Sequence, residues 1–357
     1  MLRQMFFAHF FLISCAIAVA GPSSFYSVRQ LAVPANTIQA QGSAINNRGD
    51  VAGGAILNDG RQVPVIWPAA GEPIVLWSIE GYATDINSAG VVTGHIAEGI
   101  GRNSFRWDAG VVTPLRDTRG FVVATRIDES GQVYGNVNNG GRDVTAAVEG
   151  ADGMRLLAGV ERTTSITGVN RAGVIVGKYH DGIQRGGFIA EPGGVMAPFD
   201  SRGLLDFVPL GINDGSFVVG NAIREIRRAA VFSPQFAGLL PIPDGFNRSY
   251  AGAINNRNQV IGGVREVNGF DVRPVLWDSP FEMPHDINEL IDEPARWRIS
   301  TLYDINDSGT IIGESVRNGR TSPVILQSAT AVPLPPSAFA ALTALPMFLG
   351  WKRFQKR

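Results

Sequence analysis

Cysteine and histidine are scarce in this sequence of 357 residues. The single cysteine is Cys15, and histidine occurs four times, at 9, 95, 180 and 285. The chain after Cys15 therefore has no thiol for a disulfide, a metal site or a nucleophile. No HExxH, GxSxG or phosphate-loop motif is present, and no metal-ligand spacing. We therefore expect a protein that is not an enzyme and that uses no metal or cofactor.

An excess of basic residues is also missing. The chain has 31 Lys and Arg against 32 Asp and Glu, a formal net charge of -1. Five of the basic residues lie in terminal segments that we expect to be removed, which leaves 26 basic and 32 acidic residues, a net charge of -6. Because no basic patch is available to neutralise phosphates, we expect no nucleic-acid partner.

The sequence is rich in glycine, and it repeats. Its 43 glycines indicate many tight turns and an all-β protein. The nine-residue phrase at 45–53, INNRGDVAG, returns six more times, and its second residue falls at 46, 87, 128, 170, 213, 255 and 306. The steps between copies are 41, 41, 42, 43, 42 and 51 residues. Seven units of this length must stack on one another to bury their apolar faces.

Each copy of the phrase predicts a hairpin turn. Asn or Asp at its second position can bind the backbone two residues on, and glycine three residues later accepts positive φ. Five units have this glycine, at 49, 90, 131, 173 and 309. Asn258 replaces it in the sixth unit. In the fifth unit the glycine moves forward to Gly215, and we expect a different turn geometry there.

Four short strands are predicted in each unit. The first ends in a β-branched residue before the turn, and the third has an apolar or aromatic end, such as Trp67. A weaker fourth strand follows, as at 73–77. The second strand closes on a glycine in every unit, which predicts that no side chain fits there: 53, 94, 135, 177, 220, 262 and 313. Seven four-stranded units of about 42 residues predict a seven-bladed β-propeller, with an open β-solenoid as the alternative.

One strand stands outside the repeats. Residues 25–31 alternate apolar and polar side chains, whereas the seventh unit ends after its third strand, at Leu326. We therefore predict that this N-terminal strand completes the seventh blade and closes the ring.

The repeat is interrupted by a long connection at 278–301. Long loops on a propeller face often bind ligands, so His285 and Trp297 are candidate binding residues. A simpler interpretation is structural: one helical turn capped by Asp286, with Trp297 packed over the ring.

A second group of candidates precedes the β-branched residue of the first strand. Asp85, Arg126 and Asp304 replace the small residues that other units have there, such as Ala44 and Gly168. In a propeller this position can face the central channel, so we predict a polar binding site on the axis. Paired Asn and Asp residues in the turns also suggest calcium ligands, but their constant place favours turn chemistry.

The first twenty residues are predicted to be a signal peptide. Arg3 precedes an apolar run at 5–20, and the small residues Ala18 and Ala20 predict cleavage after Ala20. The alternatives are an uncleaved anchor helix and lipidation at Cys15, which ends a lipoprotein-like box.

The last 27 residues form a separate predicted segment, 331–357, after a propeller domain at 21–330. A proline-rich stretch is followed by an apolar run at 337–351 and a basic tail at 352–357. This pattern predicts a short transmembrane helix with its tail in the cytoplasm and the body outside. The proline-rich stretch suggests a processing site, and a plain tail anchor is the alternative.

Two resemblances add to these predictions. The repeated I-N-x-x-G-x-V-V-G, the aromatic strand ends and the stretch at 286–291 resemble the HAF-type extracellular repeat of bacterial secreted proteins, over residues 25–327. Residues 331–357 resemble a PEP-CTERM sorting signal with Val332, Pro333, Leu334 and Pro335 at its motif, where the commonest form has Glu in place of leucine. The resemblance implies a Gram-negative envelope protein that is anchored transiently in the inner membrane. It also implies processing by an exosortase-type transpeptidase and an association with exopolysaccharide.

Two functions follow as hypotheses. The first is a non-enzymatic binding or matrix protein at the cell surface, which holds exopolysaccharide or another surface protein across one propeller face. The alternative is a polysaccharide hydrolase or lyase with axial carboxylates as acid and base. The scattered carboxylates favour the first.

Overall fold

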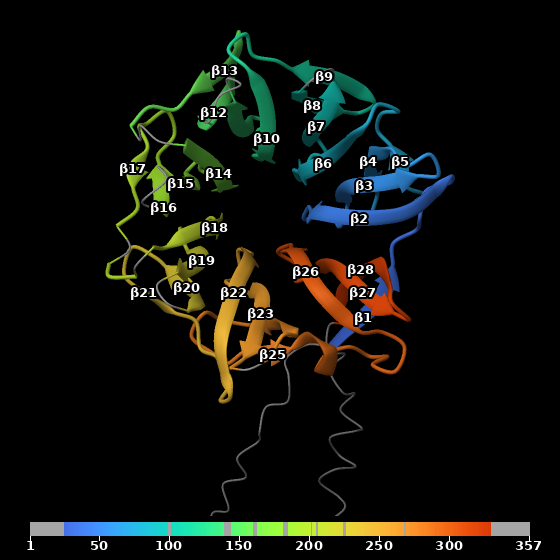
Figure 1. Ribbon diagram of the computed structural model, residues 1–357, viewed down its shortest axis with the longest axis vertical. Coiled ribbons are helices and arrows are strands. Elements are labelled where there is room, and N and C mark those ends of the chain that lie inside the picture. Colours follow the sequence, from blue (N-terminus) through green and yellow to red (C-terminus); the bar gives the residue numbers. More distant parts are fainter. Residues whose placement is uncertain are drawn as a thin grey trace, which may run out of the picture. The chain divides into compact units, whose positions relative to one another are not determined.

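Seven sheets are arranged as blades around a central axis. The computed structural model describes residues 25–329, apart from 99–100, 139–143, 160–162, 181–184, 201, 205, 224–225 and 268. Each sheet is antiparallel and has four strands, so this part of the chain is a seven-bladed β-propeller (Figure 1). The all-β class and the number of blades predicted from the repeat are confirmed.

In the first six blades the four strands follow one another in the sequence, and the first strand lies nearest the axis (Figure 1). Blades 1 to 3 consist of β2 (Thr37–Ile45), β3 (Val51–Leu57), β4 (Gln62–Trp67) and β5 (Ile74–Val75); β6 (Gly81–Ile86), β7 (Val92–Glu98), β8 (Gly101–Asp108) and β9 (Val111–Leu115); and β10 (Phe121–Ile127), β11 (Val133–Asn138), β12 (Val144–Gly150) and β13 (Gly153–Leu156). Blades 4 to 6 consist of β14 (Thr163–Val169), β15 (Ile175–His180), β16 (Arg185–Ala190) and β17 (Ala197–Pro198); β18 (Val208–Ile212), β19 (Val218–Ile223), β20 (Arg227–Phe232) and β21 (Ala237–Leu239); and β22 (Phe246–Ile254), β23 (Val260–Glu266), β24 (Val272–Trp277) and β25 (His285–Asp286).

The seventh blade is shared between distant parts of the chain. It contains β26 (Ile299–Ile305), β27 (Ile311–Arg317) and β28 (Arg320–Ala329), and its outer strand is β1 (Phe25–Gln30). β1 pairs antiparallel with β28, from Phe25 opposite Ala329 to Gln30 opposite Val324. The predicted closure by the N-terminal strand is confirmed, and it gives β28 a partner in place of an open edge.

The long connection before blade 7 covers the other edge of that closing strand. Asp286 caps a single 3-10 turn, η1 (Ile287–Glu289), by accepting a hydrogen bond from the Asn288 backbone nitrogen at 2.9 Å. Beyond it, the Tyr26 backbone nitrogen donates to Leu290 at 2.8 Å, and its carbonyl accepts from Asp292 at 2.9 Å. The extra residues of the 51-residue step thus cover the closing strand, and the turn capped by Asp286 is the one that the simpler interpretation of this connection predicted.

The turns between the first and second strands form one face of the ring, which we call the turn face. Asn46 illustrates them: its Oδ1 accepts from the backbone nitrogens of Arg48 and Asp50 at 3.0 and 2.9 Å. The Gly49 nitrogen donates to the Asn46 carbonyl at 3.0 Å, with φ of 89°. Asn258 takes the same left-handed place, with φ of 64°.

The expectation of a different turn in the fifth unit is wrong. Ser216 donates to the Asn213 carbonyl at 3.1 Å, as glycine does elsewhere, and it has a φ of 60°. The preceding Gly215 does not have positive φ. Asn213 Oδ1 accepts from the Phe217 nitrogen at 3.0 Å. Because these hydrogen bonds and the two paired strands fix the length of the loop, its fourth residue is left-handed whatever its type.

The glycine that ends each second-strand motif is required by close approach. A Cβ on Gly53 would overlap the Gln41 carbonyl oxygen, and one on Gly262 would overlap that of Tyr250, both well inside 3.0 Å. The other five glycines meet a first-strand carbonyl in the same way. The prediction that no side chain fits there is confirmed.

The core lies between neighbouring blades. One buried cluster joins Val51 and Trp67 of blade 1 to Ile312 and Ile325 of blade 7, and so packs the last blade on the first. The aromatic ends of third strands also bind backbone. Trp277 is fully buried, and its Nε1 donates to the Pro241 carbonyl at 2.9 Å.

Several predictions fall outside the described residues. These are the signal peptide with Ala18 and Ala20, the sorting motif Val332 to Pro335, and the transmembrane segment at 337–351. Within the described ranges, no helix has both the length and the apolar character to cross a membrane.

Candidate functional site: the axial channel

A β-bulge in the first strand of every blade aims one residue at the axis. In β6, β10 and β26 the register shifts between Ala83 and Asp85, between Ala124 and Arg126, and between Leu302 and Asp304. The residues that follow the seven bulges all line an axial cavity of about 230 Å³: Ala44, Asp85, Arg126, Gly168, Gly211, Ala253 and Asp304. The structure therefore brings three of the predicted site residues together in the channel.

Both axial carboxylates link neighbouring blades. Asp304 accepts from the Ile305 nitrogen of its own blade and from the Ile45 nitrogen of blade 1, each at 2.9 Å. Asp85 accepts from Ile86 at 3.0 Å and from Ile127 of blade 3 at 2.9 Å. Each of the four carboxylate oxygens thus already has a backbone donor.

The channel perturbs the acidity of these groups. Burial raises the pKa of Asp304 to about 7; the Asp85 charge raises it further, and the Ile45 backbone hydrogen bond opposes the rise. Burial also raises the pKa of Asp85, against the nearby Arg126 charge. The desolvation is partial, because both side chains keep some exposure to the channel. Asp304 is therefore a group that can exchange a proton near neutral pH.

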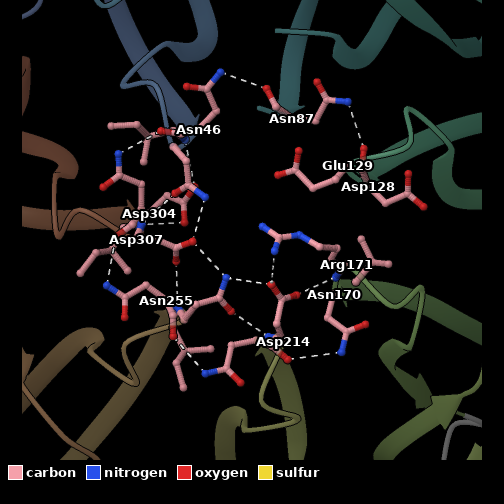
Figure 2. Close-up of a pocket in the computed structure, with 18 of the residues that line it drawn as sticks. Asn46, Asn87, Asp128, Glu129, Asn170, Arg171, Asp214, Asn255, Asp304 and Asp307 are labelled. Atoms are coloured by element: carbon pink, nitrogen blue, oxygen red, sulfur yellow. Dashed lines mark hydrogen bonds and ion pairs between the residues drawn. The ribbon is translucent and has the colours of Figure 1, made fainter. Parts of the chain in front are cut away.

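A ring of asparagines encircles the mouth of the channel on the turn face (Figure 2). In six of the seven blades the asparagine of the turn donates from Nδ2 to the backbone carbonyl of the corresponding residue in the next blade. The donors are Asn46, Asn87, Asn170, Asn213, Asn255 and Asn306, at 2.9, 3.0, 3.3, 3.0, 3.0 and 2.9 Å. We call this set the asparagine ring. Five of its bonds join residues 41 to 51 apart, the bond from Asn306 to Asn46 joins residues 260 apart, and no such bond joins blade 3 to blade 4.

The gap in the ring falls at Asp128, whose carboxylate cannot donate. It instead accepts hydrogen bonds from the Ser130 nitrogen at 2.9 Å and from the Tyr134 hydroxyl at 2.8 Å. The turn of blade 3 is preserved, but it lacks the link to Asn170.

A second set of inter-blade bonds lies inside the asparagine ring, where Arg171, Asp214 and Asp307 extend toward the middle (Figure 2). The backbone nitrogens of Arg171, Asp214 and Asn256 each donate, at 2.8 Å, to a side chain of the next blade. The acceptors are Asp214, Asn256 and Asp307 in that order. Asn256 also donates from Nδ2 to Asp214 and Asp307, at 2.9 and 3.0 Å. Within the described part of the chain, no three His, Cys, Asp or Glu side chains gather as a metal site would require.

The remaining two candidates lie away from the channel. His285 is at the outer edge of blade 6, with Nε2 3.5 Å from the Asp278 carboxylate. Trp297 packs against the core cluster under the long connection and lines a groove of about 940 Å³ between blades 6 and 7. The groove is not lined by His285, so these two candidates do not form one site.

The sequence did not reveal that the turn asparagines link neighbouring blades. It also did not reveal that the Ser and Thr residues inside four of the bulges do so. Ser43 donates to the Ala52 carbonyl at 3.0 Å and to the Ala83 carbonyl of the next blade at 2.7 Å. The hydroxyls of Thr84, Thr125 and Thr167 likewise each donate to one carbonyl of their own blade and to one carbonyl of the next blade. A Ser or Thr three residues before the turn in four successive units was the available signal.

Comparisons with known proteins identify the scaffold only. No protein-family model and no curated protein matches the chain. Among solved structures, the Pyrococcus horikoshii acylaminoacyl peptidase aligns over 85% of this chain and 54% of its own, with a TM-score of 0.54 and 12% identity. A puromycin-hydrolyzing peptidase of Mycobacterium tuberculosis aligns over 86% and 55%, with a TM-score of 0.50 and 13% identity. The chain thus spans about half of each peptidase, and at these identities the likeness is one of fold.

Proposed function

We propose that the protein is exported to the cell envelope, where it serves as a non-enzymatic binding or matrix protein for exopolysaccharide. Its export and its processing by an exosortase-type transpeptidase are supported by the N-terminal and C-terminal sequence patterns. Its non-enzymatic role is supported by the hydrogen bonds that already engage the polar groups of the channel, and its binding role by a groove on the opposite face.

The polar groups of the channel are already hydrogen-bonded within the protein. The carboxylates of Asp85 and Asp304 are engaged by backbone nitrogens, and the asparagine ring is engaged by carbonyls of the next blade. A polar group that already has hydrogen-bond partners gains less from a ligand than an unpaired group does, because binding would have to compete with those bonds. The axis is therefore better suited to holding the blades together than to holding a substrate.

The observation that carries the proposal is the groove on the face opposite the turns. This face holds the hairpins between second and third strands and the connections between blades. Beside the groove of about 940 Å³ lies Phe270, which is 94% exposed, and Trp297 forms part of its wall. An aromatic side chain that is almost fully exposed next to a groove offers an apolar surface to a ligand. The apolar faces of sugar rings suit such a surface.

The test is binding of the purified full chain to the exopolysaccharide of its host by co-sedimentation. We expect Phe270→Ser to weaken binding about fivefold, roughly 1 kcal/mol. The control is Phe281→Ser, the same change at a residue that is 57% exposed and lies in the loop between β24 and β25, on the turn face. Equal binding by both variants and the wild type would show that the groove does not bind the polysaccharide.

A second candidate function, a polysaccharide hydrolase or lyase, is favoured by one observation. The raised pKa of Asp304, about 7, beside the charge of Asp85 is a pattern that acid–base catalysis uses. The backbone hydrogen bonds to all four oxygens weigh against it.

A further inference from the structure

A second cavity, of about 490 Å³, lies between blades 5 and 6 at their ends away from the turn face. Its wall in blade 5 comes from the hairpin of β19 and β20, with Ile223 and Arg227. Its wall in blade 6 comes from β22 and the hairpin of β23 and β24, with Arg248, Tyr250 and Arg265. We call this cavity the arginine cleft, after its three arginines.

Two of these arginines face each other in a way that costs stability. Arg248 of β22 and Arg265 of β23 are direct partners across the antiparallel ladder. Their side chains therefore leave the same face of the sheet, and like charges directly opposite repel. The corresponding partners in other blades are neutral: Gln39 with Ile56, Phe121 with Asn138, and Thr163 with His180, counting histidine as uncharged. The paired arginines are thus a departure of the sixth unit from the repeat.

No counter-ion among the described residues compensates this charge. Among the described residues, the side chains of Arg227, Arg248 and Arg265 make neither an ion pair nor a hydrogen bond, although they belong to a chain of net charge -1. The adjacent Glu266 carboxylate is 2.7 Å from the guanidinium of Arg273 and faces the other groove. The cleft is therefore a local positive site on a protein that is otherwise slightly acidic.

The remaining wall of the cleft is apolar and aromatic. Tyr250 lies over its cross-strand partner Gly263, where an added Cβ would be 2.5 Å from the tyrosine ring and 2.6 Å from Val272. Glycine at this place lets the ring lie against the sheet, with Val272 beside it in the wall of the cleft. A cavity of this volume with an aromatic wall fits a ligand of one or two sugar rings.

Guanidinium groups select the charge of such a ligand. Their planar forks bind carboxylate and sulfate oxygens through two parallel hydrogen bonds, and a bound anion would relieve the repulsion between Arg248 and Arg265. We propose that the arginine cleft binds an acidic polysaccharide through its carboxylate or sulfate groups. This inference rests on the proposed function. It specifies the charge of the polymer and adds a second contact beside the groove, with which the cleft shares Val272.

The test is calorimetric titration of the purified full chain with polygalacturonate, dextran sulfate and neutral dextran of similar length. We expect binding to at least one acidic polymer, weakened by salt, and none to dextran; the tighter acidic polymer identifies the acid group. Arg248→Gln/Arg265→Gln is expected to lower the affinity about tenfold or more, and Arg227→Gln about threefold.

The control variant removes the same charge elsewhere. Arg317 and Arg320 are also opposite each other, exposed at the tip of the β27–β28 hairpin. Arg317→Gln/Arg320→Gln is expected to change the affinity less than about twofold. Equal losses in the two double variants, dextran binding as tight as that of the acidic polymers, or tighter binding to single-stranded DNA would each overturn the inference.

The host exopolysaccharide separates this inference from the proposed function. If the wild type and Arg248→Gln/Arg265→Gln bind it equally, the cleft is not the site, but the protein is still a polysaccharide-binding protein. If the wild type binds neither the host polymer nor any acidic polymer, both proposals fail. The two arginines are at least partly exposed and repel each other, so the variant should unfold at or slightly above the wild-type temperature, which a thermal melt verifies.

Discussion

The asparagine ring predicts a specific cost for replacing one amide by a carboxylate. Asn87 is 4% exposed; its Oδ1 accepts from the Val91 nitrogen at 2.9 Å, and its Nδ2 donates to the Asp128 carbonyl at 3.0 Å. In Asn87→Asp the acceptor remains, so the turn is preserved. The donor is lost, and a carboxylate oxygen faces a carbonyl oxygen.

The magnitude follows from the two groups left unpaired. Losing the hydrogen bond costs about 1 kcal/mol, and a buried acceptor without a partner costs about 1–3 kcal/mol, so the free energy of unfolding should fall by about 3 kcal/mol at pH 7. Burial should also raise the pKa of the new carboxyl above the unfolded value of about 3.9. The protonated form can donate to the Asp128 carbonyl, so the deficit should shrink at low pH and grow as pH rises through the folded-state pKa.

The assay is urea unfolding of the wild type, Asn87→Asp and Asn318→Asp at about pH 7 and about pH 4. Asn318 is exposed at a hairpin tip, so the same chemical change there should cost less than about 0.5 kcal/mol. A deficit in Asn87→Asp no larger than in this control, or one that does not depend on pH, would refute the role of the ring.

Three further predictions concern other parts of the chain. Gly262→Ala should destabilise the fold by about 3 kcal/mol in urea, because its Cβ would overlap the Tyr250 carbonyl, whereas Gly252→Ala, with 3.5 Å of room, should be tolerated. Burial raises the pKa of Asp304 to about 7, from 3.8, so the stability that this group contributes in mild acid should be lost as pH rises through about 7. Asp304→Asn should reduce this pH dependence of the free energy of unfolding, measured by urea titrations at pH values from mild acid to above about 7. The intact mass of the surface protein should lack residues 337–357, and a mass that retains them would contradict processing at the C-terminal signal.

The sequence allowed the blade count to be predicted because each unit repeats the same local demands. Asx and glycine in a turn and glycine on the second strand are set by residues within one hairpin, so their spacing alone reports them. The closing strand was predictable for the complementary reason: 25–31 had no unit, and the seventh unit had no fourth strand. The axial placement of Asp85 and Asp304 followed from the same count.

What was missed depends on contacts between units. Asn87 reaches a carbonyl 41 residues away, and no periodicity distinguishes that bond from a turn bond. The pairing of Arg248 with Arg265 requires the register of β22 on β23, which includes a bulge between Phe246 and Arg248. The error at Ser216 had a different cause: residue preference was given more weight than the loop length that the flanking strands impose.

The central claim, binding without cleavage, is tested most directly by one measurement on one sample. The purified full chain is incubated with the host exopolysaccharide, and both the bound fraction and the number of reducing ends are followed over time. The account predicts that the protein sediments with the polymer while the reducing ends stay constant. A steady rise in reducing ends, abolished by Asp85→Ala or Asp304→Ala, would contradict it and assign the channel a catalytic role.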